Sequence, residues 1–251
     1  MSSSIWTLCA GDSEIRSLHL SPWRVVEAQH QVSTRKIVDS AEEQALLEEM
    51  IDRVKPPDLT AGRLHYLLFT PFRYPPLAHG SRFGRRHDRG IWYGSTERRS
   101  AFAEVAYYRL LFLEGTHASL GTVATALTAF TARVRTARGV DLVAAPFDTH
   151  RRAIASPTSY ASSQPLGTAM RSAGVEAFRY PSARDTEDGI NVGVFVASVF
   201  GNTKPRSLET WHCSASRERV EITQGDYFKR DRFAFPRAQF LVKGVLPAPA
   251  L

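Results

Sequence analysis

Cysteine is scarce in this sequence, which has only Cys9 and Cys213 among its 251 residues. Neither has a second cysteine or a histidine at a zinc-binding spacing, so we expect neither a disulfide framework nor a metal site. Long apolar runs are also lacking, because no stretch reaches the roughly 18 apolar residues that span a bilayer. The short run from Ile5 to Ala10 is followed by acids and preceded by no basic residue, unlike a signal peptide. These absences predict a cytoplasmic protein that does not associate with membranes.

The charge balance is basic, with a formal net charge of +7. Such an excess fits a nucleic-acid surface, an acidic protein partner or a site for a phosphorylated small molecule. The basic residues are scattered in pairs and triplets, with no basic tail and no helix-turn-helix or zinc-finger pattern. Direct binding of nucleic acid is therefore not expected.

Residues 1–60 are predicted to form an N-terminal extension with one amphipathic helix. Ser40 and Glu43 form a capping box, and Pro56 and Pro57 end the helix. Between them, apolar residues recur at the spacing of one helical face, at Leu46, Leu47, Met50, Ile51 and Val54. Residues 61–251 then form the main domain, for which 43% hydrophobic residues over the whole chain indicate a packed core.

The main domain is predicted to mix helices and strands, which places it in the α/β (α+β) class. A buried helix is expected from Ser95 or Thr96 to about Glu114, and a shorter one over 165–173, closed by Gly174. A functional loop is expected over 70–90. Residues 128–145 are expected to form a hairpin with a turn at 137–139. Strands are expected over 64–69, 91–94, 175–180, 190–200, 211–222 and 239–242.

Three features of the region 73–104 point to chemistry on a dinucleotide. An arginine-dense loop offers guanidinium groups that clamp pyrophosphate, and Trp92 and Tyr93 offer aromatic rings for a base or nicotinamide. Glu104, on the predicted buried helix, can hold ribose hydroxyls or stabilise a developing oxocarbenium ion. His79 flanks the loop and is a further candidate for substrate contact. The loop arginines are Arg73, Arg82, Arg85, Arg86 and Arg89.

The run PFRYPPLAHGSRFGRRHDRGIWYGSTERRSAFAEVAYYR resembles the RES domain family, which supplies the toxin of many RES–Xre toxin-antitoxin pairs. GSRFG is similar to the family's glycine-arginine block, IWYG to its tyrosine strand, AFAEVAYYR to its glutamate helix and RYPSARD to its serine segment. The resemblance extends over roughly residues 64–215. Two features depart from the family pattern: GSRFG stands where GGRWN is more usual, and about 60 residues precede the domain.

The resemblance implies an ADP-ribosyltransferase-like core, in which NAD lies between two small β-sheets with flanking helices. It implies that Arg82 is a phosphate or ribose clamp, that Tyr93 stacks on nicotinamide and that Glu104 is the catalytic carboxylate. Ser182 would line the pocket, and Arg73 would be a second clamp. Trp92 and His79 complete the predicted substrate-binding set.

The leading functional prediction is an NAD-consuming toxin that cleaves the nicotinamide–ribose bond as a glycohydrolase or phosphorylase. NAD is then the substrate, with no permanent cofactor, and the resemblance implies an Xre-type antitoxin as partner. One alternative is a mono-ADP-ribosyltransferase that modifies a cellular protein, and another is a basic binding module without catalysis. The motifs do not encode whether the acceptor is water, phosphate or protein, and a homodimer is left open.

Overall fold

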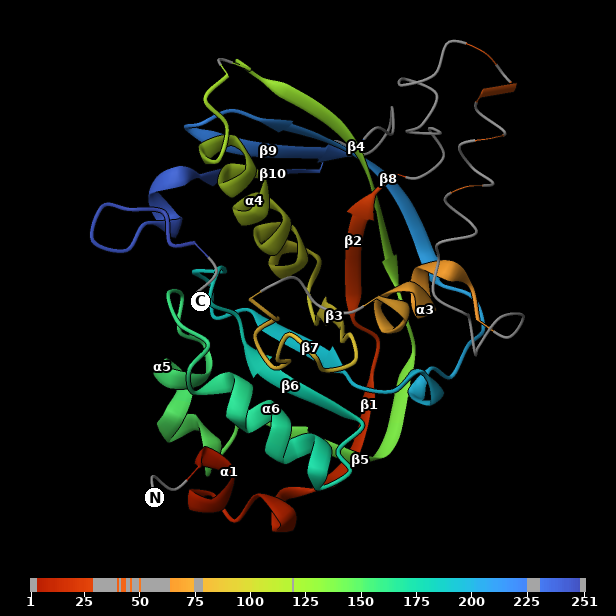
Figure 1. Ribbon diagram of the computed structural model, residues 1–251, viewed down its shortest axis with the longest axis vertical. Helices are drawn as coiled ribbons and strands as arrows, with labels where there is room; N and C mark the ends of the chain where they lie inside the picture. Colours follow the sequence, from red (N-terminus) through yellow and green to blue (C-terminus); the bar gives the residue numbers. More distant parts are fainter. Residues whose placement is uncertain are drawn as a thin grey trace.

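The computed structural model describes residues 4–28, 64–74, 79–118, 120–224 and 231–248, together with residues 40, 42, 43, 46 and 50. A ten-stranded sheet runs through this part of the chain in the order β1-β5-β6-β7-β3-β2-β4-β8-β9-β10 (Figure 1). Its neighbouring strands are antiparallel except for the parallel pair β5 and β6. The strands are β1 (Arg16–Leu20), β2 (Trp23–Glu27), β3 (Trp92–Ser95), β4 (Val123–Thr131), β5 (Val134–Asp141), β6 (Ala177–Pro181), β7 (Ile190–Val194), β8 (Arg206–Ala215), β9 (Arg219–Gln224) and β10 (Arg232–Pro236).

The middle of the sheet is its weakest join. Strands β2 and β3 are linked by the single pair Trp23 and Ser95, whereas β2 pairs with β4 along its whole length. The sheet therefore consists of two halves that separate at this join. The expected α+β class is confirmed, but the two sheets that were expected to be separate are continuous through β2 and β3.

The helices flank both halves of the sheet. They are α1 (Ile5–Leu8), α3 (Tyr66–Arg73), α4 (Arg98–Glu114), α5 (Arg151–Ile154) and α6 (Ser163–Ser172), with short 3-10 turns η1 (Gly11–Glu14), η3 (Phe147–His150), η4 (Ala197–Val199) and η5 (Arg237–Phe240). Of these, α4 contacts β3 and β7 from one half and β2, β8, β9 and β10 from the other. No helix in the described ranges is long and apolar enough to cross a membrane.

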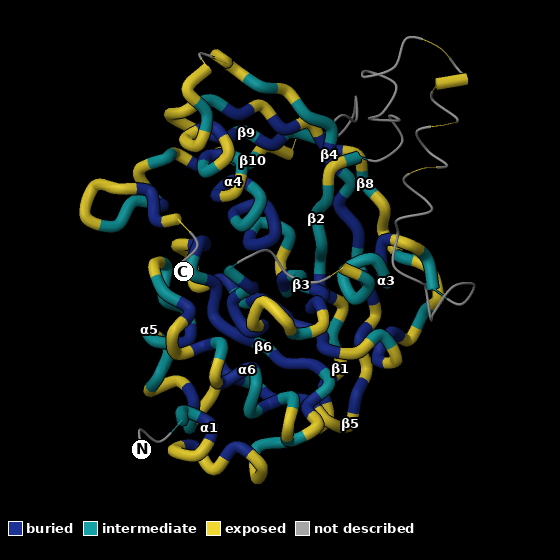
Figure 2. Tube along the Cα trace, viewed as in Figure 1, coloured by how far each residue is buried: buried dark blue, intermediate teal, exposed yellow. Residues whose placement is uncertain are grey.

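Helix α4 is buried on one side, whereas the buried helix that was expected from its apolar sequence would leave no exposed face such as the one that Tyr108 and Phe112 form, at 50% and 59% exposure. Phe102, Ala103, Ala106 and Tyr107 are fully buried, and this side of the helix packs against β4, β8 and β9 around Trp211. Figure 2 shows buried residues along one side of α4 and along β6. A second core packs α6 against β6, and a third packs α3 against β3 and β7. Helix α4 thus lies in the angle between the two halves of the sheet, with its buried side fixed.

The start of α4 differs from the expectation. The helix begins at Arg98 with Glu97 as its N-cap residue, not at Ser95 or Thr96. Ser95 belongs to β3 and donates to Asn191, and the Thr96 hydroxyl donates to the carbonyl of Ile190. Both side chains are engaged in joining β3 to β7, so neither is available to cap the helix.

Several predicted elements are confirmed and others are wrong. Strand β3, helix α6 with its left-handed Gly174, and strand β6 lie where the sequence places them. Residues 66–73 form a helix, where a strand over 64–69 and the start of the loop over 70–90 were expected; the His65 ring accepts the Leu67 N–H at the start of this helix. Residues 137–139 lie inside β5, and β4 pairs with β2 and β8, so the expected hairpin does not form. The strand expected over 211–222 is divided between β8 and β9, and the one expected over 190–200 ends at Val194. The strand expected over 239–242 is replaced at its start by a 3-10 turn over 237–240.

The N-terminal residues are more integrated than an extension. Strand β1 pairs with β5, and β2 lies between β3 and β4 in the middle of the sheet. Strand β2 joins the two halves of the sheet, because it pairs with β3 on one side and with β4 on the other. Most of the predicted helix over 40–54 lies outside the described residues, although the Glu43 N–H does donate to the Ser40 hydroxyl at 3.1 Å.

Candidate active site

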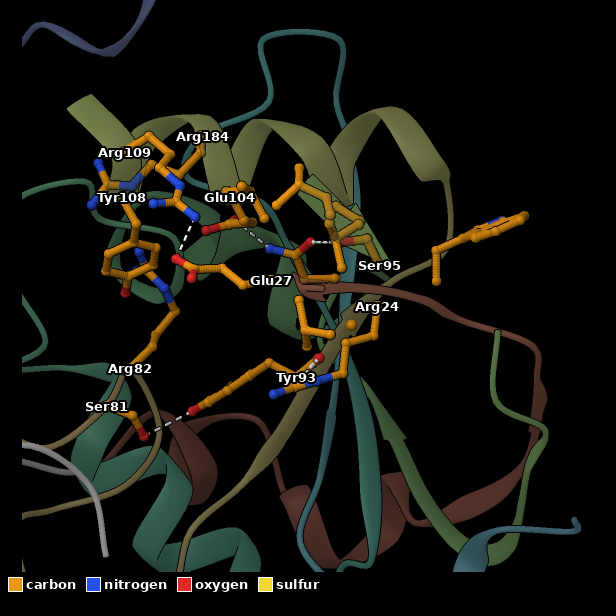
Figure 3. A pocket seen from close by; sticks show the side chains of 18 of the residues that line it. Arg24, Glu27, Ser81, Arg82, Tyr93, Ser95, Glu104, Tyr108, Arg109 and Arg184 are labelled. Atoms are coloured by element: carbon orange, nitrogen blue, oxygen red, sulfur yellow. Dashed lines mark hydrogen bonds and ion pairs between the residues drawn. The ribbon is translucent and has the colours of Figure 1, made fainter. Parts of the chain in front are cut away.

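A cavity of about 650 Å³ opens where the two halves of the sheet separate, between α4 and strands β2 and β3. Figure 3 shows Glu104, Tyr108 and Arg109 projecting from α4, with Tyr93 and Ser81 on the opposite side. The charged residues that line the cavity are the arginines Arg24, Arg82, Arg109 and Arg184 and the glutamates Glu27 and Glu104. Cations outnumber carboxylates on its wall, so the cavity suits an anionic ligand.

Glu104 is held by one of its two oxygens. Oε1 accepts a hydrogen bond from Asn191 Nδ2 at 2.6 Å and another from the Ser182 hydroxyl at 2.9 Å. Asn191 is itself oriented, because its Oδ1 accepts from the buried Ser95 hydroxyl at 2.6 Å. Within the described residues Oε2 accepts no hydrogen bond, and Glu104 lines the cavity. The carboxylate is therefore fixed in position while one oxygen remains available to a ligand.

Ser182 connects Glu104 to a tight turn after β6. Its hydroxyl donates to Glu104 and accepts from the backbone N–H groups of Arg184 and Asp185, both at 3.1 Å. Asp185 in turn accepts from the Ser100 hydroxyl at 2.6 Å and from Arg99 at 3.2 Å, which fastens the turn to the first turn of α4. Ser182 is thus a positioning group for the carboxylate, and it is not among the residues that line the cavity.

Tyr93 lies across the cavity from Glu104. Its hydroxyl is 3.0 Å from the Ser81 hydroxyl and accepts from the Phe83 N–H at 3.2 Å. Its ring meets that of Tyr180 nearly edge to face, at 6.3 Å and 78°. Burial raises the pKa of Tyr93 to about 12 against the opposing effect of its two hydrogen bonds, so the phenol is neutral at physiological pH. The same burial, reinforced by the Glu104 carboxylate, raises the pKa of Tyr180 well above its usual value.

Arg82 is directed at the cavity by the loop after α5. Its Nη1 donates to the carbonyl oxygens of Ser156 at 2.8 Å and Ile154 at 3.3 Å. The guanidinium carbon lies 5.1 Å from the centre of the Tyr160 ring, and the side chain is 9% exposed. Two carbonyl partners and one ring hold the cation in place, while no carboxylate neutralises it within the described ranges.

Helix α6 holds the loop that carries Arg82. Gln164 Nε2 donates to the carbonyls of His79 and Ser81 at 3.1 Å each. A Cβ atom at Gly167 would lie 2.0 Å from the Phe83 carbonyl oxygen, so only glycine permits this approach of loop and helix. The predicted functional loop is therefore ordered by contacts from a distant part of the chain.

Arg24 is a site residue that the sequence analysis missed. It projects from β2, donates to the Tyr93 carbonyl at 2.6 Å and lies 5.4 Å from the centre of the Trp92 ring. Its Nε is buried and unpartnered within the described residues, and burial lowers its pKa to about 10, which leaves it charged at neutral pH. An arginine inside the short apolar strand Trp23–Glu27 was the available signal, because a charge in such a strand needs a partner.

Arg184 and Arg109 were also missed. Arg184 lies 3.5 Å from the centre of the Tyr107 ring and donates to the Pro157 carbonyl at 3.0 Å, while its Nη1 is buried and unpartnered in the described part of the chain. Arg109 forms an ion pair with Glu27 beside it (Figure 3). Arg184 follows the predicted Ser182 by two residues, and Arg109 follows Glu104 by five. Both therefore lie in motifs that were recognised, but neither was predicted to be a site residue.

The predicted site residues separate into two groups. Arg82, Tyr93 and Glu104 line the cavity together, and Ser182 bonds to Glu104. Trp92 does not fit its predicted contact with substrate: it is fully buried beside Phe200, because successive residues of β3 point to opposite sides of the sheet. His79 lines a neighbouring cavity, and Arg73 ends α3 outside the lining of both.

The family model of the RES domain matches residues 55–216, well over half of the chain. The chain belongs to the RES domain family. No curated protein matches it. Membership supports an NAD-acting function in general terms.

The RES domain of this chain brings its four motif blocks together at the cavity. GSRFG supplies Arg82 and Ser81, IWYG supplies Tyr93, AFAEVAYYR supplies Glu104, and RYPSARD supplies Ser182. The family model begins at residue 55, whereas the cavity is completed by β2, which precedes it. The arrangement offers one oriented carboxylate, a neutral phenol and several cations, which suits cleavage of a bond that develops positive charge beside an anionic group.

Proposed function

We propose that this protein consumes NAD by cleaving the bond between nicotinamide and ribose, with water or phosphate as acceptor. The observation that carries the proposal is how the two carboxylate oxygens of Glu104 are hydrogen-bonded. Asn191 and Ser182 hold one carboxylate oxygen, and the other has no hydrogen-bond partner among the described residues of a cavity rich in arginine. A fixed anion of this kind stabilises a cation that forms beside it.

The chemistry follows from the charge on each group. When the glycosidic bond breaks, its electron pair goes to the nicotinamide nitrogen, and the ribose becomes an oxocarbenium-like cation. Glu104 stabilises that cation, and water or phosphate then forms the new bond to the same ribose carbon. With water the products are nicotinamide, ADP-ribose and a proton, and with phosphate the ribose carries the new phosphate ester.

The remaining groups suit the rest of the substrate. Arg82 and Arg184 are held by backbone carbonyls and aromatic rings, without a carboxylate partner within the described ranges, and so can bind substrate oxygens on the nicotinamide side without first breaking an ion pair. The Tyr93 ring offers an apolar, neutral surface for nicotinamide. Leaving-group release then needs no proton from the protein, because nicotinamide departs as a neutral molecule.

The test is NAD consumption by the purified protein, with and without phosphate, alongside Glu104→Ala and Arg82→Ala. Matched controls are Glu114→Ala, an exposed glutamate on the same helix, and Arg86→Ala, an exposed arginine in the same loop. Loss of NAD that only the first pair abolishes supports the proposal, and its phosphate dependence identifies the acceptor. Intact NAD with every form of the protein would contradict it.

The toxin role and the Xre-type antitoxin are part of the same proposal. If the protein depletes cellular NAD, induced expression lowers the NAD pool and stops growth, and Glu104→Ala relieves both effects. Transfer to a protein gives a different result, since nicotinamide is released while labelled ADP-ribose stays on a polypeptide. Growth arrest with an unchanged NAD pool would therefore favour the transferase.

A further inference from the structure

A second cavity, of about 500 Å³, adjoins the first. The two share Arg24, Ser81, Tyr93 and Tyr108 on their walls, whereas Glu104 lines only the first. A ligand whose reacting end lies at Glu104 can therefore extend past Arg24 into the second cavity.

The second cavity offers aromatic surfaces that are partly exposed. Tyr66, Tyr74 and Tyr108 line it and are 44%, 41% and 50% exposed. The guanidinium carbon of Arg73 lies 5.9 Å from the centre of the Tyr74 ring, which restrains that ring from one side. Restrained and exposed rings beside a cavity are stacking surfaces for a planar group.

The charge at the shared wall is positive. No aspartate or glutamate is among the described residues that line the second cavity, and Arg24 is its arginine. Arg24 keeps a buried Nε without a partner in the described part of the chain, and its pKa of about 10 keeps it charged at neutral pH. A planar base next to an anion fits these surroundings, which is the chemistry of a nucleoside phosphate.

We propose that the second cavity binds the adenosine monophosphate half of NAD, with adenine stacked on its tyrosine rings and the pyrophosphate beside Arg24. The inference rests on the proposed function for the placement of the other half at Glu104. It adds a distinct binding site, lined by α3, β2 and the loop residues before β3, to the one at α4. It also assigns a role to Arg24, which lines both cavities and would bind the pyrophosphate that joins the two halves of the dinucleotide.

The experiment is calorimetric binding of ADP-ribose, which contains the adenosine half and lacks nicotinamide. Tyr74→Ala is expected to raise the Kd roughly 5- to 150-fold, the range for loss of one stacked base. Tyr74→Phe keeps the ring and is expected to bind as the wild type does. Leu208→Ala removes a side chain that is 57% exposed and lines neither cavity, and it serves as the control.

Turnover provides a second readout. Nicotinamide mononucleotide lacks the adenosine monophosphate half of NAD. Tyr74→Ala should therefore lower kcat/KM for NAD by raising KM, and should leave kcat/KM for the mononucleotide unchanged. Equal binding of ADP-ribose by the wild type and Tyr74→Ala, an equal loss in Tyr74→Phe, or no binding at all would overturn the inference. Binding that depends on the Tyr74 ring without NAD turnover would support the second cavity and reject the proposed function.

Discussion

Asn191 Nδ2 donates a hydrogen bond of 2.6 Å to Glu104 Oε1, and through it β7 fixes the carboxylate of α4. Asn191 cannot rotate without losing the Ser95 hydroxyl, which donates to its Oδ1 at 2.6 Å. These hydrogen bonds thus connect the sheet to the helix along the wall of the cavity, from Ser95 through Asn191 to Glu104. Both Ser95 and Asn191 are almost fully buried, so the geometry is set before any ligand binds.

Glu104→Gln should separate charge from shape. The amide oxygen can still accept from Asn191 and Ser182, but no negative charge remains to stabilise the ribose cation. We expect kcat/KM for NAD to fall by about 10²- to 10³-fold, the usual effect of removing one transition-state contact. Thermal unfolding should change little. A variant with the wild-type rate would remove Glu104 from the chemistry.

Asn191→Ala should affect both activity and stability. The Ser95 hydroxyl loses its acceptor in a buried position, at a cost of about 1–3 kcal/mol in the free energy of unfolding. Glu104 loses one of its two donors, so kcat should fall more than KM rises. Adding Ser95→Ala removes the orphaned hydroxyl and should restore part of the stability but none of the activity. Recovery of both together would mean that Asn191 acts only through folding.

Gly167→Ala should loosen the loop that carries Arg82. The new methyl group would lie 2.0 Å from the Phe83 carbonyl oxygen, so helix and loop must move apart. We expect a loss of about 1–3 kcal/mol in the free energy of unfolding, together with weaker NAD binding. Gly115→Ala is the matched control, because its added atom meets nothing closer than 3.5 Å. Equal stability of the two variants in denaturant unfolding would refute the steric argument.

Tyr93 should make stability fall at alkaline pH. Burial raises its pKa to about 12, above the value of about 10 for an unfolded chain. Below pH 10 the phenol is neutral in both states, and between about pH 10 and 12 the unfolded state ionises first, which lowers the free energy of unfolding. The difference in free energy of unfolding between the wild type and Tyr93→Phe should be constant below pH 10. Above pH 10 the wild type should lose stability relative to Tyr93→Phe. A difference that stays constant to pH 12 in denaturant titrations would contradict the raised pKa.

The parts of the fold that sequence reasoning recovered are those decided by neighbouring residues. Helix α4 is predicted by a long apolar segment, and α6 by its glycine cap, because these signals act within a few turns of chain. The apolar run at 64–69 is too short for its periodicity to separate strand from helix, and most of it lies in α3, which contacts β3 and η4. The predicted hairpin failed because β4 found its partners in β2 and β8.

In the candidate site, too, some features follow from neighbouring residues and others from contacts between distant segments. The chemical groups and the family follow from local sequence, since the motifs around Arg82, Tyr93, Glu104 and Ser182 are contiguous and ordered. Which neighbours serve these groups depends on the folded chain: Tyr93 faces the cavity while Trp92 faces the core, and Arg24 joins the site from β2. Strand order and side-chain direction depend on contacts between distant segments, and no local pattern carries that information.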